Sequence, residues 1–417
     1  MSPTLSPAPT PSTQPAAPNK QSSARLLSLD AYRGAIMISL AFAGFGLAET
    51  AKRHLEKDET SDFWSSIAFQ FEHVEWTGGG YWDMIQPSFM FMVGVSMAYS
   101  YVKREQLGQS YGRMFAHASI RAVVLVLLGV FLSSNGAKMT NWAFMNVLTQ
   151  IGLGYVFLFF MWRRGAALQI AACVVLLLGT WLGYTNYPEA DIDIETGNPA
   201  VGVSAEWASQ HLSDVQPAWH KNANIGHAID VKLLNWFPRA EPFEFNSGGY
   251  QTINFIPSLA TMILGLICGE WLRSTMSDAR KFWLIVALGS VCMLAGWLLS
   301  TYEIIPVIKR IWTPSWALLS TGGCCLILAV LFGVIDVMQW RGWAFPLVVV
   351  GTNSIAVYLM SQMLKPWVGR TLQTHFGQDV FLALGDTWEP FVRANLIGLV
   401  FWLVCLWLYK QRVFLKI

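Results

Sequence analysis

Residues 71–102 read FEHVEWTGGGYWDMIQPSFMFMVGVSMAYSYV, and the part from residue 84 onward contains no charged side chain. A helix needs about 20 consecutive, mainly apolar residues to cross a bilayer, and the 84–102 run has that length. The stretch therefore predicts a membrane-spanning helix. A histidine, three acids and three consecutive glycines lie just before it.

Runs of this kind recur along the whole chain. Of its 417 residues, 54% are hydrophobic and 13% are charged, whereas a soluble domain carries about 25% charged residues. The sequence therefore predicts an all-α polytopic membrane protein with about ten transmembrane helices. The predicted spans are residues 31–49, 84–102, 118–134, 143–161, 166–184, 252–272, 282–300, 314–337, 343–363 and 391–409.

Lysine and arginine gather in alternate short loops, which sets the predicted orientation in the membrane. Such loops contain, for example, residues 103–113, 163–164 and 273–281, and the pattern places both termini in the cytoplasm. The longer loops on the opposite, extracytoplasmic side cover residues 50–82, 185–250 and 364–390.

Residues 1–24 are rich in Ser, Pro, Thr and Ala and predict a disordered tail. The remaining residues, 25–417, form one predicted membrane domain. With no apolar leader in the tail, the first apolar helix is expected to target the membrane itself.

The composition also excludes some functions. A net charge of +2 lacks the concentrated basic face of a nucleic-acid-binding protein. The six cysteines lie in apolar runs without CxxC or Cys/His clusters, so we expect neither a disulfide framework nor a metal site.

His73 is the first candidate for chemistry, because an imidazole can accept and return a proton near neutral pH. Glu72 or Glu75 could orient its ring and favour its charged form. Asp83 is either a supporting acid or simply the N-cap of the 84–102 helix. The competing interpretation of the whole stretch is an ordinary surface turn.

Two further sets are polar residues at or within spans. Asp30 and Arg33 lie three positions apart in RLLSLDAYRG (25–34). The planar guanidinium of an arginine suits phosphate oxygens. The plainer explanation is a helix cap, with an arginine side chain that extends back to the membrane surface. Polar faces in other spans fit either interhelical hydrogen bonds or a wetted path. These faces are Asn146 with Gln150, Asn254 with Ser258 and Thr261, and Asn353 with Ser354 and Tyr358.

Taken in order, these segments resemble the heparan-α-glucosaminide N-acetyltransferase family of the transmembrane acyltransferase group. The resemblance rests on motifs that begin at residue 25 and cover nearly the whole chain. They are SLDAYRG, HVEWTGGGYWDMIQPSFMFMVG, NVLTQIGLGY, TINFIPSLATMILGLICGEWL and GTNSIAVYL.

The resemblance implies an enzyme that moves an acetyl group from cytoplasmic acetyl-CoA to an amino sugar or glycan on the far side. It implies that His73 is catalytic, as a general base or as a carrier of the acetyl group, with Glu72, Glu75 and Asp83 in support. It also implies a set of acetyl-CoA-binding residues. These are Asp30, Arg33, Gln150, Asn254, Asn353 and Ser354.

The chain departs from the family pattern at three places that bear on the acceptor or on the acetyl carrier. Gly44 stands where the family has an asparagine, and FNSGG (245–249) replaces an acidic segment. The family's Q-R pair in the 143–161 span is displaced, with Gln150 as the nearest amide. The expected partners are the lipid bilayer and the acceptor, with a homodimer left open, and the expected location is a bacterial inner membrane. A sugar or glycan-fragment transporter is the alternative function, and a catalytically inactive glycan-binding scaffold is a third.

Overall fold

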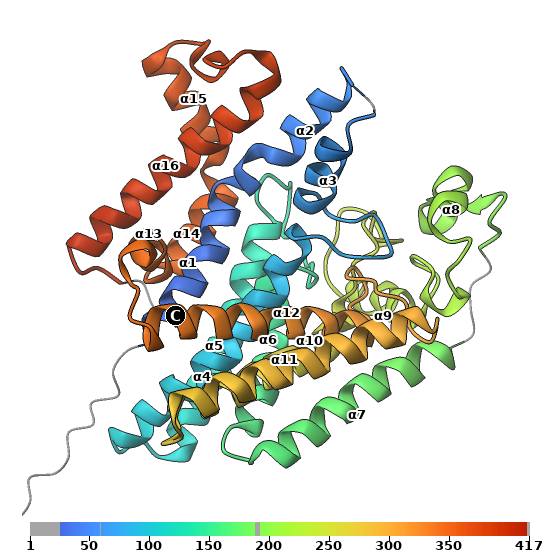
Figure 1. Ribbon diagram of the computed structural model, residues 1–417. Coiled ribbons are helices and arrows are strands. Elements are labelled where there is room, and N and C mark those ends of the chain that lie inside the picture. The colour runs from blue at the N-terminus through green and yellow to red at the C-terminus, as the bar shows by residue number, and fades with distance from the viewer. Residues whose placement is uncertain (1–25, 59, 188–191, 415–417) are drawn as a thin grey trace, which may run out of the picture.

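The computed structural model describes residues 26–58, 60–187 and 192–414, and this part of the chain is almost entirely helical (Figure 1). The predicted tail, residues 1–24, lies outside the described residues. The helices are α1 (Leu27–Ala41), α2 (Leu47–Leu55), α3 (Asp62–Phe71), α4 (Ile85–Gln106), α5 (Tyr111–Ser133), α6 (Val147–Met161), α7 (Ala166–Thr185), α8 (Ala205–His211), α9 (Ile225–Leu234), α10 (Phe255–Arg273), α11 (Asp278–Thr301), α12 (Pro314–Leu331), α13 (Phe345–Gly351), α14 (Ser354–Met363), α15 (Lys365–Phe376) and α16 (Glu389–Lys410). Strands β1 (Gly197–Asn198) and β2 (Val203–Ser204) form a small antiparallel pair.

Six helical segments among the described residues are long and apolar enough to cross a membrane, which identifies an integral membrane protein. They are Tyr111–Ser133, Ala166–Thr185, Thr252–Arg273, Asp278–Thr301, Pro314–Val337 and Asp386–Lys410. Two bent pairs, α1 with residues 43–55 and residues 342–351 with α14, raise the number to eight. The two other predicted spans are helices as well, but α6 is short and α4 is less apolar than the six, because its uncharged part contains Gln, Ser and Tyr residues. The count of ten and the cytoplasmic termini therefore stay predictions.

Helix α10 is the central helix of the bundle. In its 18-residue apolar stretch 83% of the residues are buried, compared with 17% in that of α7. It crosses α4 at van der Waals distance because glycines face the neighbouring backbone. A Cβ at Gly94 would lie 1.9 Å from the Met262 carbonyl oxygen, and one at Gly265 would lie 2.2 Å from that of Phe91. Small residues of this kind let membrane helices pack closely. Here they fix the position of α4, which directly follows the stretch that carries His73.

Helix α1 breaks after Ala41, and its direction changes by 46° into α2. Residues 43–46, AGFG, all have positive φ angles of 47° to 69°, so the break is a left-handed turn. Gly44 lies inside this turn. The other bend, 67° between residues 342–351 and α14, occurs at Thr352 and Asn353.

The segments that join the spans at the His73 end fold into a layer of their own. Trp76, Tyr184, Trp219 and Ile308 are almost fully buried in one apolar cluster of this layer. The cluster draws its members from the His73 stretch, from the end of α7, from the 192–250 segment and from the segment before α12. Segments distant in sequence are thus held together around His73. In Figure 1 this layer lies on the side of α8 and α9, and α15 and α16 form the opposite edge.

All six cysteines are free and buried, as expected for small core residues of the bundle.

Candidate active site

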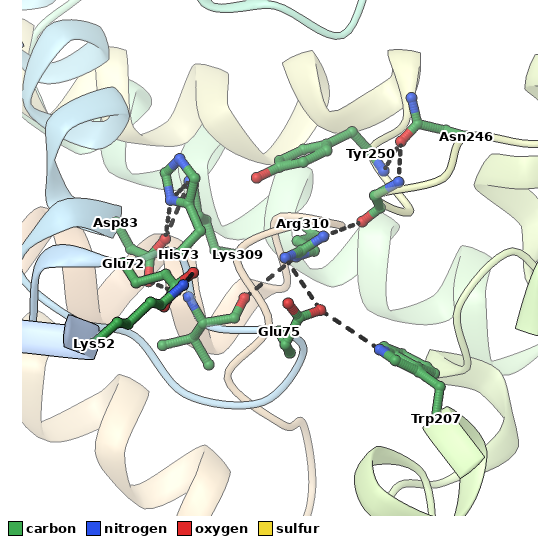
Figure 2. A network of polar contacts seen from close by, with 12 residues as sticks. Lys52, Glu72, His73, Glu75, Asp83, Trp207, Asn246, Tyr250, Lys309 and Arg310 are labelled. Carbon is green, nitrogen blue, oxygen red and sulfur yellow. Dashed lines mark hydrogen bonds and ion pairs between the residues drawn. The ribbon is translucent and has the colours of Figure 1, made fainter. Parts of the chain in front are cut away.

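His73 lies just after α3 and forms a hydrogen bond with Asp83. The Nδ1 atom of His73 is 2.8 Å from Oδ1 of Asp83 (Figure 2). The Asp83 side chain is 1% exposed, whereas that of His73 is 43% exposed. A buried carboxylate therefore fixes one edge of a ring that is still partly exposed to solvent.

Asp83 is held by its second oxygen as well. Its Oδ2 atom accepts hydrogen bonds from the backbone N–H groups of Gly80 (3.1 Å) and Val74 (3.3 Å). Burial alone would raise the pKa of Asp83, but the hydrogen bond from His73 and the positive charge of Lys309 lower it below its ordinary value. Asp83 is therefore a stable anion at neutral pH.

Asp83 is not the N-cap of α4. Met84 occupies that position, and the helix start has no side-chain cap hydrogen bond. Asp83 instead lies in a short 3₁₀ turn, Trp82–Met84, that turns its carboxylate back toward His73. The structure therefore excludes the N-cap, and the role of Asp83 as a supporting acid stays a prediction.

Lys309 is the third member of this group of side chains, and it is not among the site residues predicted from the sequence. Its Nζ atom lies 2.9 Å from Nδ1 of His73 and 3.1 Å from Oδ1 of Asp83, and its side chain is 7% exposed. It comes from the 302–313 segment between α11 and α12, more than 200 residues away along the chain. The sequence does carry a signal for it. Lys309 and Arg310 are adjacent cations in a loop predicted to be extracytoplasmic, where lysine and arginine are depleted.

The triad allows two proton arrangements. With a proton on Nδ1, His73 donates to Asp83, Lys309 forms an ion pair with the same carboxylate, and the Nε2 atom is left as a base. Without a proton on Nδ1, His73 accepts from the Lys309 ammonium, and Nε2 carries the proton. In the second arrangement the Nδ1 lone pair faces Oδ1 of Asp83 at 2.8 Å and that hydrogen bond is lost, so Asp83 favours the first arrangement, in which Nε2 is free.

Two of the three glycines let the His73 stretch lie against the segment that carries Lys309 and the helix that follows it. The Gly78 N–H donates to the Val307 carbonyl at 2.7 Å, with φ of +106° at Gly78. A Cβ at Gly79 would lie 2.3 Å from a ring carbon of Trp316 at the start of α12. The close approach permitted by these glycines is thus to the protein's own chain.

Arg310 joins three segments around the site. Its guanidinium donates to the carbonyl oxygens of Gly248 (2.9 Å) and Val74 (3.3 Å), and its own carbonyl accepts from the Asn254 side chain at 2.8 Å. The FNSGG segment is therefore a structural support of Arg310 in this chain. Asn246 stabilises that segment by accepting from the N–H groups of Gly248 and Tyr250.

The expectation that Glu72 or Glu75 orients the imidazole is corrected. Glu72 forms an ion pair with Lys52 at 2.6 Å. Glu75 faces Arg310 at 3.6 Å and Trp207 at 3.5 Å. Figure 2 shows the two glutamates in separate contacts, Glu72 with Lys52 and Glu75 with Arg310 and Trp207. The acid ten residues after His73 reaches the ring because the chain reverses at the glycines.

The residues predicted to bind acetyl-CoA fall into two groups. Gln150 and Asn254 lie at the His73 end of the bundle, where Gln150 donates to the Phe144 and Thr252 carbonyls at 2.8 and 3.0 Å. At the other end, the close packing of Gly351 on the Asp30 carbonyl brings Asn353 and Ser354 near α1. Asn353 donates there to the Val413 carbonyl, and Ser354 donates to that of Gly351.

Arg33 lies at this second end, which we term the Arg33 end. Its guanidinium is 3.3 Å from Asp30 and donates to Ser96 on α4, and its side chain is 29% exposed. Tyr99, one turn further along α4, has a buried hydroxyl with no hydrogen-bond partner among the described residues, and the Arg273 guanidinium lies 5.8 Å from its ring. Two arginines and an unsatisfied hydroxyl are groups that fit a phosphate-bearing ligand.

The polar faces predicted within the spans are mainly structural. Asn146 accepts from the Thr149 N–H and caps α6. Thr261 of α10 accepts from Thr321 of α12 at 2.9 Å, which is an interhelical hydrogen bond. In the described part of the chain no group of three or more His, Cys, Asp and Glu side chains is arranged to hold a metal ion.

Comparison with known proteins gives a distant relationship. No protein-family model matches the chain. The chain is 22% identical over 431 residues to heparan-alpha-glucosaminide N-acetyltransferase of Mus musculus, which covers 95% of this chain and 61% of the relative. The protein of the same name from Homo sapiens is 22% identical over 438 residues, covering 94% of this chain and 60% of the relative. The chain thus spans about three fifths of the length of the curated relatives it matches, and the similarity supports a distant relationship to these N-acetyltransferases.

Proposed function

We propose that the protein is a membrane acetyltransferase that moves an acetyl group from cytoplasmic acetyl-CoA to an amino sugar or glycan on the other side of the membrane. The observation that carries the proposal is the half-exposed His73 ring, held by the buried Asp83 carboxylate and Lys309. The distant similarity to two N-acetyltransferases along nearly the whole chain supports the same activity. In this proposal the His73 end faces away from the cytoplasm.

In direct transfer, Nε2 of His73 removes a proton from the acceptor amine while the amine nitrogen attacks the carbonyl carbon of the acetyl thioester. The new C–N bond forms, the C–S bond breaks, and the proton on Nε2 passes to the leaving thiolate. Asp83 stabilises the imidazolium that exists between these two proton transfers. In the alternative route, Nε2 attacks the carbonyl carbon of the thioester, and the C–S bond breaks as the thiolate leaves. The acceptor amine then attacks the acetyl group, the bond to Nε2 breaks, and the proton of the amine passes through Nε2 to the thiolate.

When bound, acetyl-CoA supplies the activated thioester. Arg33 and Arg273 would hold its phosphates at the Arg33 end, where Tyr99 offers a buried hydroxyl. The two ends of the bundle then have separate tasks. The Arg33 end binds the donor, and the His73 end carries out proton transfer.

The deciding experiment measures transfer of labelled acetyl from acetyl-CoA to a panel of amino sugars by the purified protein in lipid nanodiscs. We expect transfer by the wild type, none by His73→Ala, and unchanged CoA affinity in that variant. CoA binding to His73→Ala shows that the variant is folded. Absence of both CoA binding and transfer in the wild type would refute the proposal. Uptake of labelled sugar into proteoliposomes without acetylation would establish the transporter instead.

A further inference from the structure

The indole of Trp82 lies beside the imidazole of His73. The two ring centroids are 6.2 Å apart, and the ring planes are tilted by 45°. Trp82 immediately precedes Asp83 in the short 3₁₀ turn, so the turn that supplies the acid also brings the indole to the same histidine. Trp82 is half-buried, and the His73 side chain is 43% exposed. A flat apolar surface therefore lies next to the candidate base.

Gly44 makes room for this indole. It belongs to the left-handed turn after α1, and a Cβ built on it would lie 3.3 Å from ring carbons of both Trp82 and Phe71. Carbon atoms pack best at about 3.5–4.0 Å, so a side chain at position 44 would press on the indole. Phe71 packs in turn on Tyr81, with ring centroids 5.2 Å apart. The turn and Phe71 thus set the position of Trp82.

Two plainer roles of a tryptophan do not account for this position. Tryptophans at a membrane surface anchor a protein by contacting lipid headgroups, but the indole of Trp82 contacts the turn after α1 and lies beside His73. Tryptophans of the apolar cluster in this layer are closed to solvent, as are Trp76 at 1% and Trp219 at 0% exposure. Trp82 differs from both kinds because it is partly open and borders the candidate active site.

A second aromatic ring borders the triad at Lys309. The Lys309 ammonium lies 5.7 Å from the centroid of the Tyr250 ring. Figure 2 shows this ring extending toward His73 and Lys309. Asn246 fixes the backbone of Tyr250 by accepting from its N–H at 3.1 Å. The surroundings of His73 therefore combine a few charged groups with aromatic rings, as sites for small molecules commonly do.

We infer that Trp82 is a specificity-determining residue that stacks on the apolar face of the acceptor's sugar ring. A pyranose carries C–H groups on its faces and hydroxyl groups around its rim, so an indole can cover a face while the hydroxyls stay in water. A ring held in this way keeps its amine beside His73, whereas an open-chain amine offers no flat face. The inference rests on the proposed acetyl transfer to an amino sugar, and it assigns the sugar ring to one side chain.

The test compares glucosamine with glucosaminitol, its open-chain reduction product, which keeps the amine and the hydroxyl groups but has no ring. Binding to His73→Ala protein in lipid nanodiscs is measured by titration calorimetry, so that catalysis is not needed. Covering about 50 Å² of apolar ring surface is worth about tenfold in affinity, and we expect that preference for glucosamine. Trp82→Leu, added to His73→Ala, should reduce the preference to below about threefold. Trp82→Phe keeps a flat ring and should retain most of it.

Trp236→Leu is the matched control, at a tryptophan of the 192–250 segment that is 80% exposed, and it should leave the preference intact. CoA binding shows that each variant is folded. With His73 present, Trp82→Leu should raise KM for glucosamine about tenfold and change kcat by less than about threefold. Trp82→Phe should bring KM most of the way back.

Equal affinity of the His73→Ala protein for the two amines would overturn the inference, as would equal losses in Trp236→Leu and Trp82→Leu. If Trp82→Leu and Trp82→Phe both lose CoA binding together with glucosamine binding, the indole is a structural support and the inference is wrong. A ring preference in binding without any transfer would refute the acetyltransferase but retain the stacking residue. Transfer without a ring preference would refute the stacking residue alone.

Discussion

The Nζ atom of Lys309 lies 2.9 Å from Nδ1 of His73, although 236 positions separate the two residues. Both atoms approach the same oxygen of Asp83, which is almost fully buried. A cation beside an imidazole opposes protonation of the ring, and the carboxylate favours it.

Asp83→Asn should lower kcat at least about 100-fold, since an amide cannot stabilise the imidazolium or keep the ring in the tautomer with a free Nε2. The Asn side chain preserves the shape and can still accept from Gly80 and Val74. Initial rates of labelled acetyl transfer give the measurement, with Asp379→Asn, at an exposed aspartate, as the control. Activity within threefold of wild type would remove Asp83 from the mechanism.

Lys309→Met should shift the acid limb of the pH–rate profile to higher pH, because loss of the neighbouring positive charge favours the imidazolium. It should also lower the free energy of unfolding by about 3 kcal/mol, since a buried carboxylate loses its ion-pair partner. Lys309→Arg restores the charge and should bring the profile most of the way back. A variant that is less stable but keeps an unchanged profile would show a purely structural role.

The apolar helices could be predicted from the sequence, because hydropathy is a local property, whereas the catalytic role of His73 stays a prediction. The contact with Lys309 could not be predicted, since it depends on how the 302–313 segment folds over the glycines. Asp83 was identified, but its role stayed open because an acid before a helix is most often a cap. Glu72 and Glu75 were predicted to orient the His73 ring because they are close to it in sequence. The backbone instead directs their side chains to Lys52 and Arg310.

Gly79→Ala should destabilise the site, because the added methyl group would lie 2.3 Å from the Trp316 ring. Overpacking of this kind costs about 1–3 kcal/mol, and movement of the glycine stretch would displace Asp83 from His73. The measurements are the thermal unfolding midpoint in detergent and the rate of transfer. Gly179→Ala in α7, where an added Cβ meets nothing within 4 Å, is the matched control and should not lower either quantity. Equal behaviour of the two variants would show that the approach of Gly79 to Trp316 is not needed.

Arg33→Ala should weaken CoA binding about tenfold, as expected for loss of one charge-assisted contact to phosphate. Its affinity for pantetheine, which has no phosphate, should stay the same. Isothermal titration of both ligands separates the phosphate contact from general damage to the Arg33 end. Arg280→Ala, at an exposed arginine, is the control. Unchanged CoA affinity in Arg33→Ala, or an equal loss for pantetheine, would contradict the assignment.

Asp230 in α9 should make the protein less stable as the pH rises. Burial raises its pKa to about 6, only partly offset by hydrogen bonds from Thr252 and the charge of Arg239. The folded chain therefore binds this proton more tightly than the unfolded chain, whose ordinary value is 3.8. Stability then falls between about pH 4 and pH 6, and the loss is complete above that window.

Asn cannot ionise and can still accept from the Thr252 N–H, which bonds to Oδ2 of Asp230 at 3.0 Å. We therefore expect Asp230→Asn to unfold at a higher temperature than wild type at pH 7.5. Its free energy of unfolding should exceed that of wild type by up to about 3 kcal/mol. At pH 4.5 most of that difference should disappear, because the wild-type carboxyl is then protonated. Thermal unfolding of both proteins at the two pH values is the measurement. A gain that is equal at both pH values would mean that the ionised carboxylate is not the cause, and a loss at pH 7.5 would mean that Asp230 forms a stabilising charged contact instead.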